Sequence, residues 1–332
     1  MFINPIISVI IPCNHGQREL FALLQAICNQ TCKPNEIVIV DSSITGGACP
    51  LELNEICASC SITLNYEYID RAMPGKSRNI GLVKANGDFI AFIDVQTIPR
   101  PHWLETSMKL IDGNGVAGVW GATCFQAETR FEMLVRDGFY GVLAKSTLPG
   151  SFFRRDVFGK VGQFIEWSRA GEDTEWMLRV EVLKIKVVQP ADALIDYVGL
   201  FGTNTMQLLK KWFRNYSASR ELPHFFPQKL LVWLILYPLI VLIAFNWNYL
   251  IADWRMDSPM YLGHVTKIMV SLPFFIYILI RGLVMPLKRG VRMRQLFPIR
   301  FIKIAMVCLM ADAVKILVFS RLKLKRDTEV NL

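Results

Sequence analysis

Strand-like and helix-like segments alternate along the first hundred residues, and this alternation constrains the fold more than any other feature. Apolar segments of strand length, rich in β-branched residues, occupy residues 6–11, 36–40, 62–68 and 89–93. Between them lie helix-like segments, of which residues 18–30 carry apolar side chains at helical spacing. Strands separated by helices at this interval predict an open parallel α/β sheet, in which ligands bind beyond the carboxyl ends of the strands.

Polar residues and a proline stand where three of these strands end. Pro12 follows the first strand, Asp41 the second and Asp94 the fourth. We therefore expect all three to face the crevice at the carboxyl edge of the sheet. For Asp41 an alternative stays open, because the sequence Asp41-Ser42-Ser43 is also suited to capping a following helix.

Two adjacent acidic residues stand near the start of a later helix. Residues 150–156 predict an inner strand that opens into a short helix, and Gly171 begins an amphipathic helix that ends near Lys184. Glu172 and Asp173 lie at its start, where carboxylates interact favourably with the helix dipole. A carboxylate beside a cleft can instead accept a proton from an attacking hydroxyl group. Spacing alone does not separate these two interpretations.

The last third of the chain differs in composition from the rest. Hydrophobic residues make up 52% of the protein and its net charge is +9. Charged residues are interspersed up to about Arg220, whereas the remainder alternates long apolar runs with basic clusters. This pattern predicts a first domain over residues 1–222 and a membrane region over residues 223–332. Because the basic residues lie beside apolar runs, we expect contact with an anionic membrane leaflet and no nucleic-acid partner.

Two apolar stretches are predicted to span the membrane. Residues 230–247 contain no charge, and residues 268–287 carry only Arg281, near one end. The dense basic segment that follows the second stretch belongs on the cytoplasmic side. We therefore expect a multi-pass protein of the inner (cytoplasmic) membrane whose first domain lies in the cytoplasm. Residues 6–12 lack the features of a secretory signal.

A third apolar stretch, residues 301–320, contains Lys303, Asp312 and Lys315. Crossing the membrane here would export the basic residues that follow. The sequence favours an interfacial or re-entrant helix in which Asp312 pairs with Lys315.

The eight cysteines include a pattern that resembles a zinc site. Its members are Cys28, Cys32, Cys57 and Cys60, with no histidine nearby. In a reducing compartment scattered cysteines are usually small buried hydrophobes, and we interpret them in this way.

A set of short motifs occurs in an order that resembles family 2 glycosyltransferases over roughly the first 200 residues. The motifs are Ile6–Pro12, Gln30-Thr31, Glu36–Asp41, Gly75–Gly81, Asn86–Asp94, Pro101–Leu104, Arg154-Arg155 and Gly171–Arg179. The resemblance implies the GT-A fold, a Rossmann-like nucleotide-diphospho-sugar transferase domain, and inversion at the anomeric carbon.

The resemblance also implies roles at the donor and catalytic sites. Asp41 would hydrogen-bond the nucleoside base, with Pro12 and Asn14 lining the same pocket. Asp173 would be the catalytic base, with Glu172 beside it.

For the donor diphosphate, Asp94 would hold Mg2+ or Mn2+ as the first aspartate of an Asp-x-Asp element. The family expects a second aspartate where this chain has Gln96. Asp94 would then hold the ion with water and phosphate ligands, or cationic side chains such as Lys76 and Arg78 would replace it. Arg155 and its neighbour Arg154 would add positive charge near the leaving group, or would be surface residues at a strand end.

The expected reaction moves a sugar from a nucleotide-sugar, a UDP- or dTDP-sugar, to a hydroxyl group of a membrane lipid-linked glycan acceptor. The basic and aromatic helix over residues 207–216 is expected at the membrane interface. One alternative is transfer to a polyprenyl phosphate. Another is a catalytically silent partner subunit, suggested by Gln96.

Overall fold

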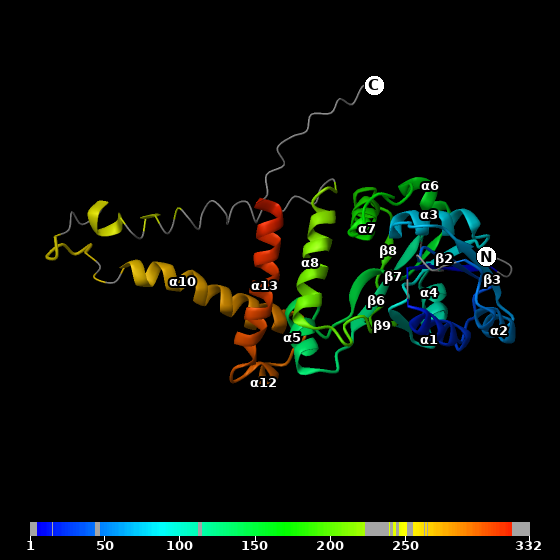
Figure 1. Ribbon diagram of the computed structural model, residues 1–332, viewed down its shortest axis with the longest axis horizontal. Coiled ribbons are helices and arrows are strands. Elements are labelled where there is room, and N and C mark those ends of the chain that lie inside the picture. Colours follow the sequence, from blue (N-terminus) through cyan, green and yellow to red (C-terminus); the bar gives the residue numbers. More distant parts are fainter. Residues whose placement is uncertain are drawn as a thin grey trace, which may run out of the picture.

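The computed structural model describes residues 5–14, 16–43, 47–111, 115–222, 239, 242–243, 246–250, 255–261, 263 and 265–320. An α/β body lies at one end of the molecule, and the C-terminal helices form an extension beside it (Figure 1).

One mixed sheet of nine strands forms the centre of the body. Its order is β3-β2-β1-β4-β7-β6-β9-β5, and β8 pairs with β6. The strands are β1 (Ile7–Cys13), β2 (Glu36–Asp41), β3 (Thr63–Tyr68), β4 (Phe89–Phe92), β5 (Thr97–Pro99), β6 (Gly118–Phe125), β7 (Lys145–Arg154), β8 (Val187–Val188) and β9 (Ile195–Tyr197).

The predicted parallel sheet is correct for its first half and wrong for its second. Strands β1 to β4 run parallel, but β7 is antiparallel to both β4 and β6. Residues 150–153 of β7 are buried on both faces of the strand. A strand of this kind has the same hydrophobic pattern whichever way it runs, so the pattern does not encode its direction.

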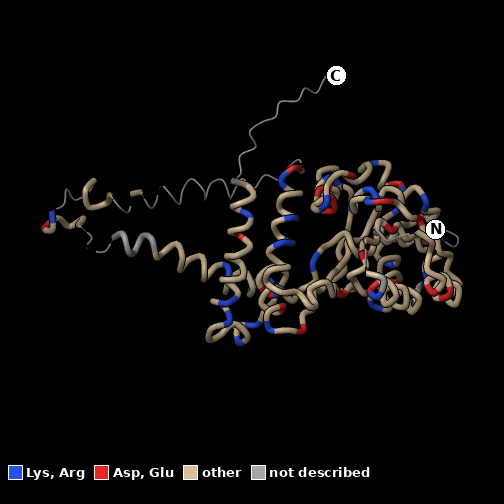
Figure 2. Tube along the Cα trace, viewed as in Figure 1, with Lys and Arg blue, Asp and Glu red and all other residues tan. Residues whose placement is uncertain are grey.

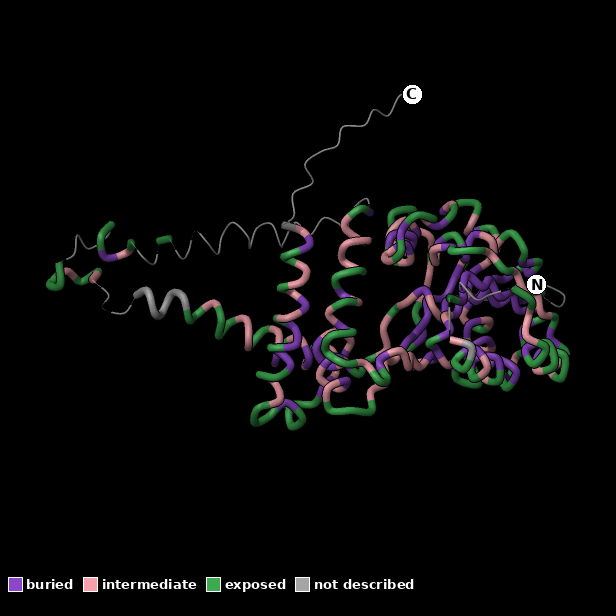
Figure 3. The backbone as a smooth tube through the Cα atoms, in the orientation of Figure 1, coloured by how far each residue is buried: buried purple, intermediate pink, exposed green. Residues whose placement is uncertain are grey.

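Helices cover both faces of the sheet and enclose two apolar cores, seen as the buried sheet in Figure 3. One core lies under α1, α2 and α4, and the other under α3, α6 and α7. The helices of the body are α1 (Gln17–Cys28), α2 (Leu51–Ser59), α3 (Pro74–Lys84), α4 (Trp103–Ile111), α5 (Arg130–Phe139), α6 (Asp156–Val161), α7 (Glu172–Val182) and α8 (Thr205–Ser219).

The helical extension packs against α5 and α8. Its elements are α10 (Val265–Leu279), the π-helix η1 (Ile280–Val284), α11 (Met285–Lys288), α12 (Met293–Leu296) and α13 (Arg300–Ser320). Val307 and Ala311 of α13 share an apolar cluster with Val135 of α5 and with Leu208 and Trp212 of α8.

A buried carboxylate reinforces this packing. The Arg300 guanidinium donates to the fully buried Asp137 of α5 at 2.6 Å. The extension is therefore docked on the α/β body by both apolar and ionic contacts.

The predicted pairing of Asp312 with Lys315 is wrong. Asp312 accepts hydrogen bonds from Tyr277 at 2.8 Å and from Arg281 at 3.3 Å, while the Lys315 ammonium lies 5.9 Å from the centre of the Tyr216 ring. Neighbouring helices supply these partners, and sequence spacing within one helix does not reveal them.

Among the described residues, one helical stretch, Ser271–Lys288, is long and apolar enough to cross a membrane. It overlaps the span predicted over residues 268–287. The span predicted over residues 230–247 lies mainly outside the described residues. The stretch predicted over residues 301–320 is helical as α13, which crosses α10 rather than running beside it (Figure 1).

Candidate active site

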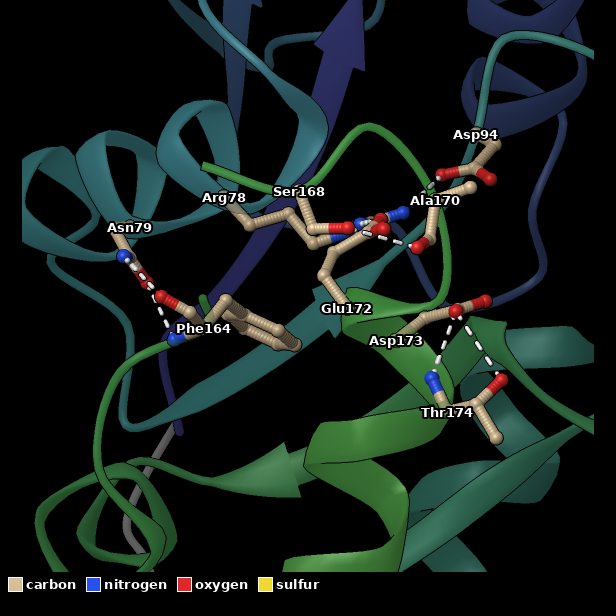
Figure 4. A network of polar contacts seen from close by, with 9 residues as sticks. All are labelled: Arg78, Asn79, Asp94, Phe164, Ser168, Ala170, Glu172, Asp173 and Thr174. Atoms are coloured by element: carbon tan, nitrogen blue, oxygen red, sulfur yellow. Dashed lines mark hydrogen bonds and ion pairs between the residues drawn. The ribbon is translucent and has the colours of Figure 1, made fainter. Parts of the chain in front are cut away.

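A buried arginine joins two carboxylates that are distant in the sequence. Arg78 of α3 is 3% exposed. Its guanidinium donates to Glu172 Oε1 at 2.6 Å and to Asp94 Oδ1 at 3.0 Å (Figure 4). The same group lies 5.8 Å from the centre of the Phe164 ring. Arg78 therefore connects α3, the carboxyl end of β4 and the start of α7 at one point.

Two residues of α3 position the loop that leads into α7. Asn79 donates to Phe164 O and to Glu166 Oε1, both at 2.9 Å, and accepts from Phe164 N at 2.9 Å. Gly75 allows close approach of the same loop, because an added Cβ would lie 2.0 Å from Ile165 O. Burial of Trp176 against the Phe164 ring holds the start of α7 in place.

The site concentrates negative charge around this arginine. Burial raises the pKa of Glu172; the positive charge of Arg78 opposes this effect and the negative charge of Asp173 adds to it. Burial also raises the pKa of Asp94. The charge of Arg78 again opposes this effect, and the charge of Asp173 adds to it. Burial alone would lower the pKa of Arg78, but the facing carboxylates outweigh it and raise that pKa. The guanidinium is therefore held in its charged form.

Asp173 stands at the rim of this cluster. Its carboxylate is partly exposed, and its Oδ1 accepts from Thr174 N at 2.7 Å and from Thr174 Oγ1 at 3.3 Å. A carboxylate that is held at one oxygen and reachable by solvent has the geometry of a general base. Glu172, 4% exposed and bound to Arg78, is instead placed to support it.

A second polar cluster lies at the end of β2. Asp41 accepts from Ser43 N at 2.8 Å, from Ser43 Oγ at 3.1 Å and from Tyr66 OH at 2.6 Å. The capping alternative is wrong, because the following helix, α2, begins at Leu51 with Pro50 as its N-cap. Asp41 closes a turn at the carboxyl edge of the sheet.

The other residues predicted to line the nucleoside pocket belong to the same edge. Pro12 of β1 is in register with Val40 of β2, and the exposed Asn14 follows directly after β1. The structure thus places Pro12, Asn14 and Asp41 at adjacent strand ends, as expected.

The element that carries the expected metal ligand has one available carboxylate. Asp94 binds Arg78 through Oδ1, and its side chain is 34% exposed. The amide oxygen of Gln96 accepts from Tyr197 OH at 3.1 Å. Among the described residues, no three His, Cys, Asp or Glu side chains are grouped to hold a metal ion. Because Mg2+ often binds one carboxylate together with substrate phosphates and water, this donor set fits a metal brought with the donor.

The structure does not bring Arg155 to the candidate site. Its guanidinium donates to Gly87 O at 2.6 Å and to Ala85 O at 2.7 Å. Its neighbour Arg154 is in register with Phe89, the first residue of β4. Because β7 runs antiparallel to β4, its last residues lie at the amino edge of the sheet, opposite Asp94. The prediction that Arg155 adds charge near the leaving group is therefore wrong.

Lys76 is exposed on α3, two residues from Arg78. Residues two apart on a helix do not face the same way, so Lys76 and Arg78 point to different sides of α3.

Asn79, Tyr66 and Tyr197 were not predicted as site residues. The only sequence signal for them is that Asn79 lies within the Gly75–Gly81 motif.

The chain is similar to known glycosyltransferases. The family described as Glycosyl transferase family 2 matches residues 8–168. Glycosyltransferase AglE of Haloferax volcanii is 27% identical over 226 residues, which cover 63% of this chain and 71% of AglE.

Another relative is the pre-mycofactocin glycosyltransferase of Mycobacterium tuberculosis, 31% identical over 193 residues. The match covers 52% of this chain and 38% of that relative, so the chain spans well under half of its length. The solved structure of the mannosyltransferase PcManGT from Pyrobaculum calidifontis, in complex with GDP-Man and Mn2+, is similar in fold with a TM-score of 0.52 at 14% identity. The similarity covers 94% of this chain and 87% of that one.

The mixed α/β body is thus GT-A-like. From the family match and these relatives together, the chain is a transferase whose residues 8–168 form a family 2 glycosyltransferase domain.

Proposed function

We propose that this chain is an inverting glycosyltransferase that moves a sugar from a nucleotide-sugar to a hydroxyl group of a membrane lipid-linked glycan. In this reaction Asp173 removes the proton of the attacking hydroxyl group, and the nucleoside diphosphate leaves in a single displacement.

One observation carries this proposal. Arg78 joins Asp94 at the end of β4 to Glu172 at the start of α7, next to Asp173. A carboxylate suited to the base thereby lies beside the strand end where the donor diphosphate is expected. The sheet edge that holds Asp41, Pro12 and Asn14 continues from this point, and there these residues would bind the nucleoside.

The donor is proposed to arrive with a divalent cation. Asp94 would be the protein ligand of Mg2+ or Mn2+, which would neutralise charge on the departing diphosphate. PcManGT, whose complex contains GDP-Man and Mn2+, supports this choice and adds GDP-sugars to the UDP- and dTDP-sugars as donors to examine.

The acceptor and the location belong to the same proposal. The apolar stretch Ser271–Lys288 and the exposed apolar residues of α10 and α13 favour attachment to the cytoplasmic membrane, with the α/β body in the cytoplasm. An enzyme held there meets a lipid-linked acceptor directly. The helix that contains residues 207–216, α8, packs beside α13 and so lies next to this surface.

The test uses the full chain in detergent micelles. Donors are first screened by thermal stabilisation with and without Mn2+, because a ligand that binds the folded state raises its apparent stability. Turnover is then measured with polyprenyl-diphosphate-linked sugars and with a polyprenyl phosphate as acceptors. The proposal expects transfer to the sugar hydroxyl group, and chelation of the metal should abolish it.

The catalytic assignment is tested with Asp173→Asn. Loss of a general base is expected to lower kcat by roughly 100-fold to 10,000-fold, with an unchanged KM for the donor. The matched control is Asp156→Asn, because Asp156 is also an aspartate in the first turn of a helix and forms an exposed ion pair with Lys160 at 2.6 Å. Equal turnover by the wild type and Asp173→Asn would overturn the assignment.

A further inference from the structure

Helix α8 lies along one side of the candidate site and touches it near its middle and at its C-terminal end. Near its middle, Lys211 Nζ is 3.4 Å from Tyr197 OH, and that hydroxyl group donates to Gln96. At its C-terminal end, Ser219 packs on the turn before Glu172, since a Cβ added to Gly171 would lie 3.0 Å from Ser219 Oγ. The segment between Lys211 and Ser219 therefore runs from the Asp94–Gln96 element to the start of α7.

Three basic side chains gather along this segment and the loop that faces it. Lys211 and Arg214 are three residues apart on α8 and so lie on one side of the helix. Arg169 belongs to the loop directly before Glu172 and Asp173. Figure 2 shows basic residues at successive turns of α8.

The electrostatics connect the three residues to one another. Burial lowers the pKa of Lys211, and the charge of Arg214 lowers it further. Burial also lowers the pKa of Arg214, and the charge of Arg169 adds to that effect. Arg214 therefore lies close enough to both Lys211 and Arg169 for their charges to repel.

No acidic side chain of the described part of the chain forms an ion pair with any of the three. The Tyr197 ring, 6.0 Å from Lys211 Nζ, supports that one ammonium group. Arg214 Nε donates to Asn215 Oδ1 at 3.4 Å, a neutral partner that brings no negative charge. Lys211 is half-buried, whereas Arg214 and Arg169 are exposed beside it. Like charges gathered in this way repel one another, and a bound anion would reduce this repulsion.

The surroundings indicate which anion fits. Asp41, proposed to bind the nucleoside, lies at the end of β2, and β1, β4, β7 and β6 separate β2 from β9, whose Tyr197 contacts α8. On its other side, α8 packs through Leu208 and Trp212 against α13, which exposes Met306 and Leu309. A cationic group beside an apolar surface suits a lipid with a phosphorylated head group.

We propose that Lys211, Arg214 and Arg169 bind the phosphate or diphosphate of the lipid-linked acceptor and so position its sugar beside Asp173. This site rests on the proposed function and names the part of the acceptor that the enzyme recognises.

The test measures binding to the full chain in detergent micelles, without turnover. The probes are farnesyl diphosphate, farnesol and inorganic pyrophosphate, and the variants are Lys211→Met and Arg214→Gln. Each variant is expected to bind farnesyl diphosphate roughly tenfold to a hundredfold more weakly, because a charge-assisted contact is lost. Binding of farnesol should not change.

Lys109→Met is the matched control, because Lys109 is an exposed lysine in the last turn of another helix, α4. It should bind all three probes like the wild type. Should Lys211→Met fail to fold, Arg214→Gln and the charge-conserving Lys211→Arg, which should retain most of the binding, carry the test.

The proposal would be overturned if Lys211→Met and Arg214→Gln bound farnesyl diphosphate as tightly as the wild type does. The proposal would also be overturned if the wild type bound inorganic pyrophosphate as tightly as farnesyl diphosphate, since the site would then take a free anion. Displacement of farnesyl diphosphate by a nucleotide donor would assign the three residues to the donor instead. Asp173→Asn should bind farnesyl diphosphate normally, so a failure of the catalytic assignment can be told apart from a failure of this site.

Discussion

Arg78 illustrates how one side chain can hold a site together. It is a buried cation, and the two carboxylates that it contacts come from β4 and α7. The second oxygen of Glu172, Oε2, is buried without a hydrogen-bond partner. Without the guanidinium, both carboxyl groups would face each other and Asp173 with no positive charge between them.

We predict that Arg78→Met destabilises the protein by about 3–5 kcal/mol, because it leaves a buried charge without its partner. Thermal unfolding of the full chain in detergent measures this loss. Lys84→Met is the control on the same helix, since Lys84 forms an ion pair that is largely exposed. A loss no larger than that of the control would contradict the role assigned to Arg78.

The loss of stability in Arg78→Met should also depend on pH. The pKa values of Glu172 and Asp94 are already raised in the folded protein, and removing Arg78 raises them further. A carboxyl group with a raised folded pKa binds its proton more tightly in the folded state, so stability falls as pH rises from the ordinary carboxyl range toward the folded pKa. The deficit of Arg78→Met should therefore grow as pH rises from the folded pKa of these groups in the wild type to their higher folded pKa in the variant, and be smallest at acid pH.

At the scale of elements, the loop over residues 164–171 leads from α6 to α7, the helix that carries Asp173. Asn79 holds its start with three hydrogen bonds, and Gly75 leaves space for it. The position of Asp173 therefore depends on α3 as well as on α7.

We predict that Asn79→Ala lowers kcat about tenfold with little change in the KM for the donor. A small displacement of Asp173 slows the proton transfer but leaves donor binding nearly unchanged. It should also destabilise the protein by about 3 kcal/mol, since buried backbone groups of Phe164 lose their partners. Turnover and thermal unfolding measure the two effects. Asn54→Ala, on the exposed side of α2, is the control; an unchanged kcat in Asn79→Ala would refute the positioning role.

At the scale of the whole molecule, α13 has two different faces. Ile304, Cys308 and Ala311 are buried against the body. Ile302, Met306, Leu309, Ile316 and Leu317 are exposed at helical spacing on another face. An apolar stripe of this kind on a helix that crosses α10 is typical of a helix lying in a membrane surface.

We predict that the double variant Met306→Glu and Leu309→Glu binds anionic lipid vesicles more weakly than the wild type, because two charges enter the stripe. Sedimentation with vesicles measures the bound fraction, and donor hydrolysis should stay unchanged. The control carries Val83→Glu and Val182→Glu, two exposed apolar residues of the α/β body. Equal loss of binding in both variants would argue against a specific role for α13.

The sequence by itself determined strands β1 to β4 and β7, helices α1, α3, α7 and α8, and the positions of Asp41, Asp94 and Asp173 at strand and helix ends, but not β5, β6, β8 or β9. These features depend on hydrophobic period and on residues close together in the chain. The tertiary structure alone decided the direction of β7, the distance of Arg155 from the site and the partners of Arg78 and Asp312. Each of these depends on contacts between distant segments, and a strand buried on both faces has the same pattern in either direction.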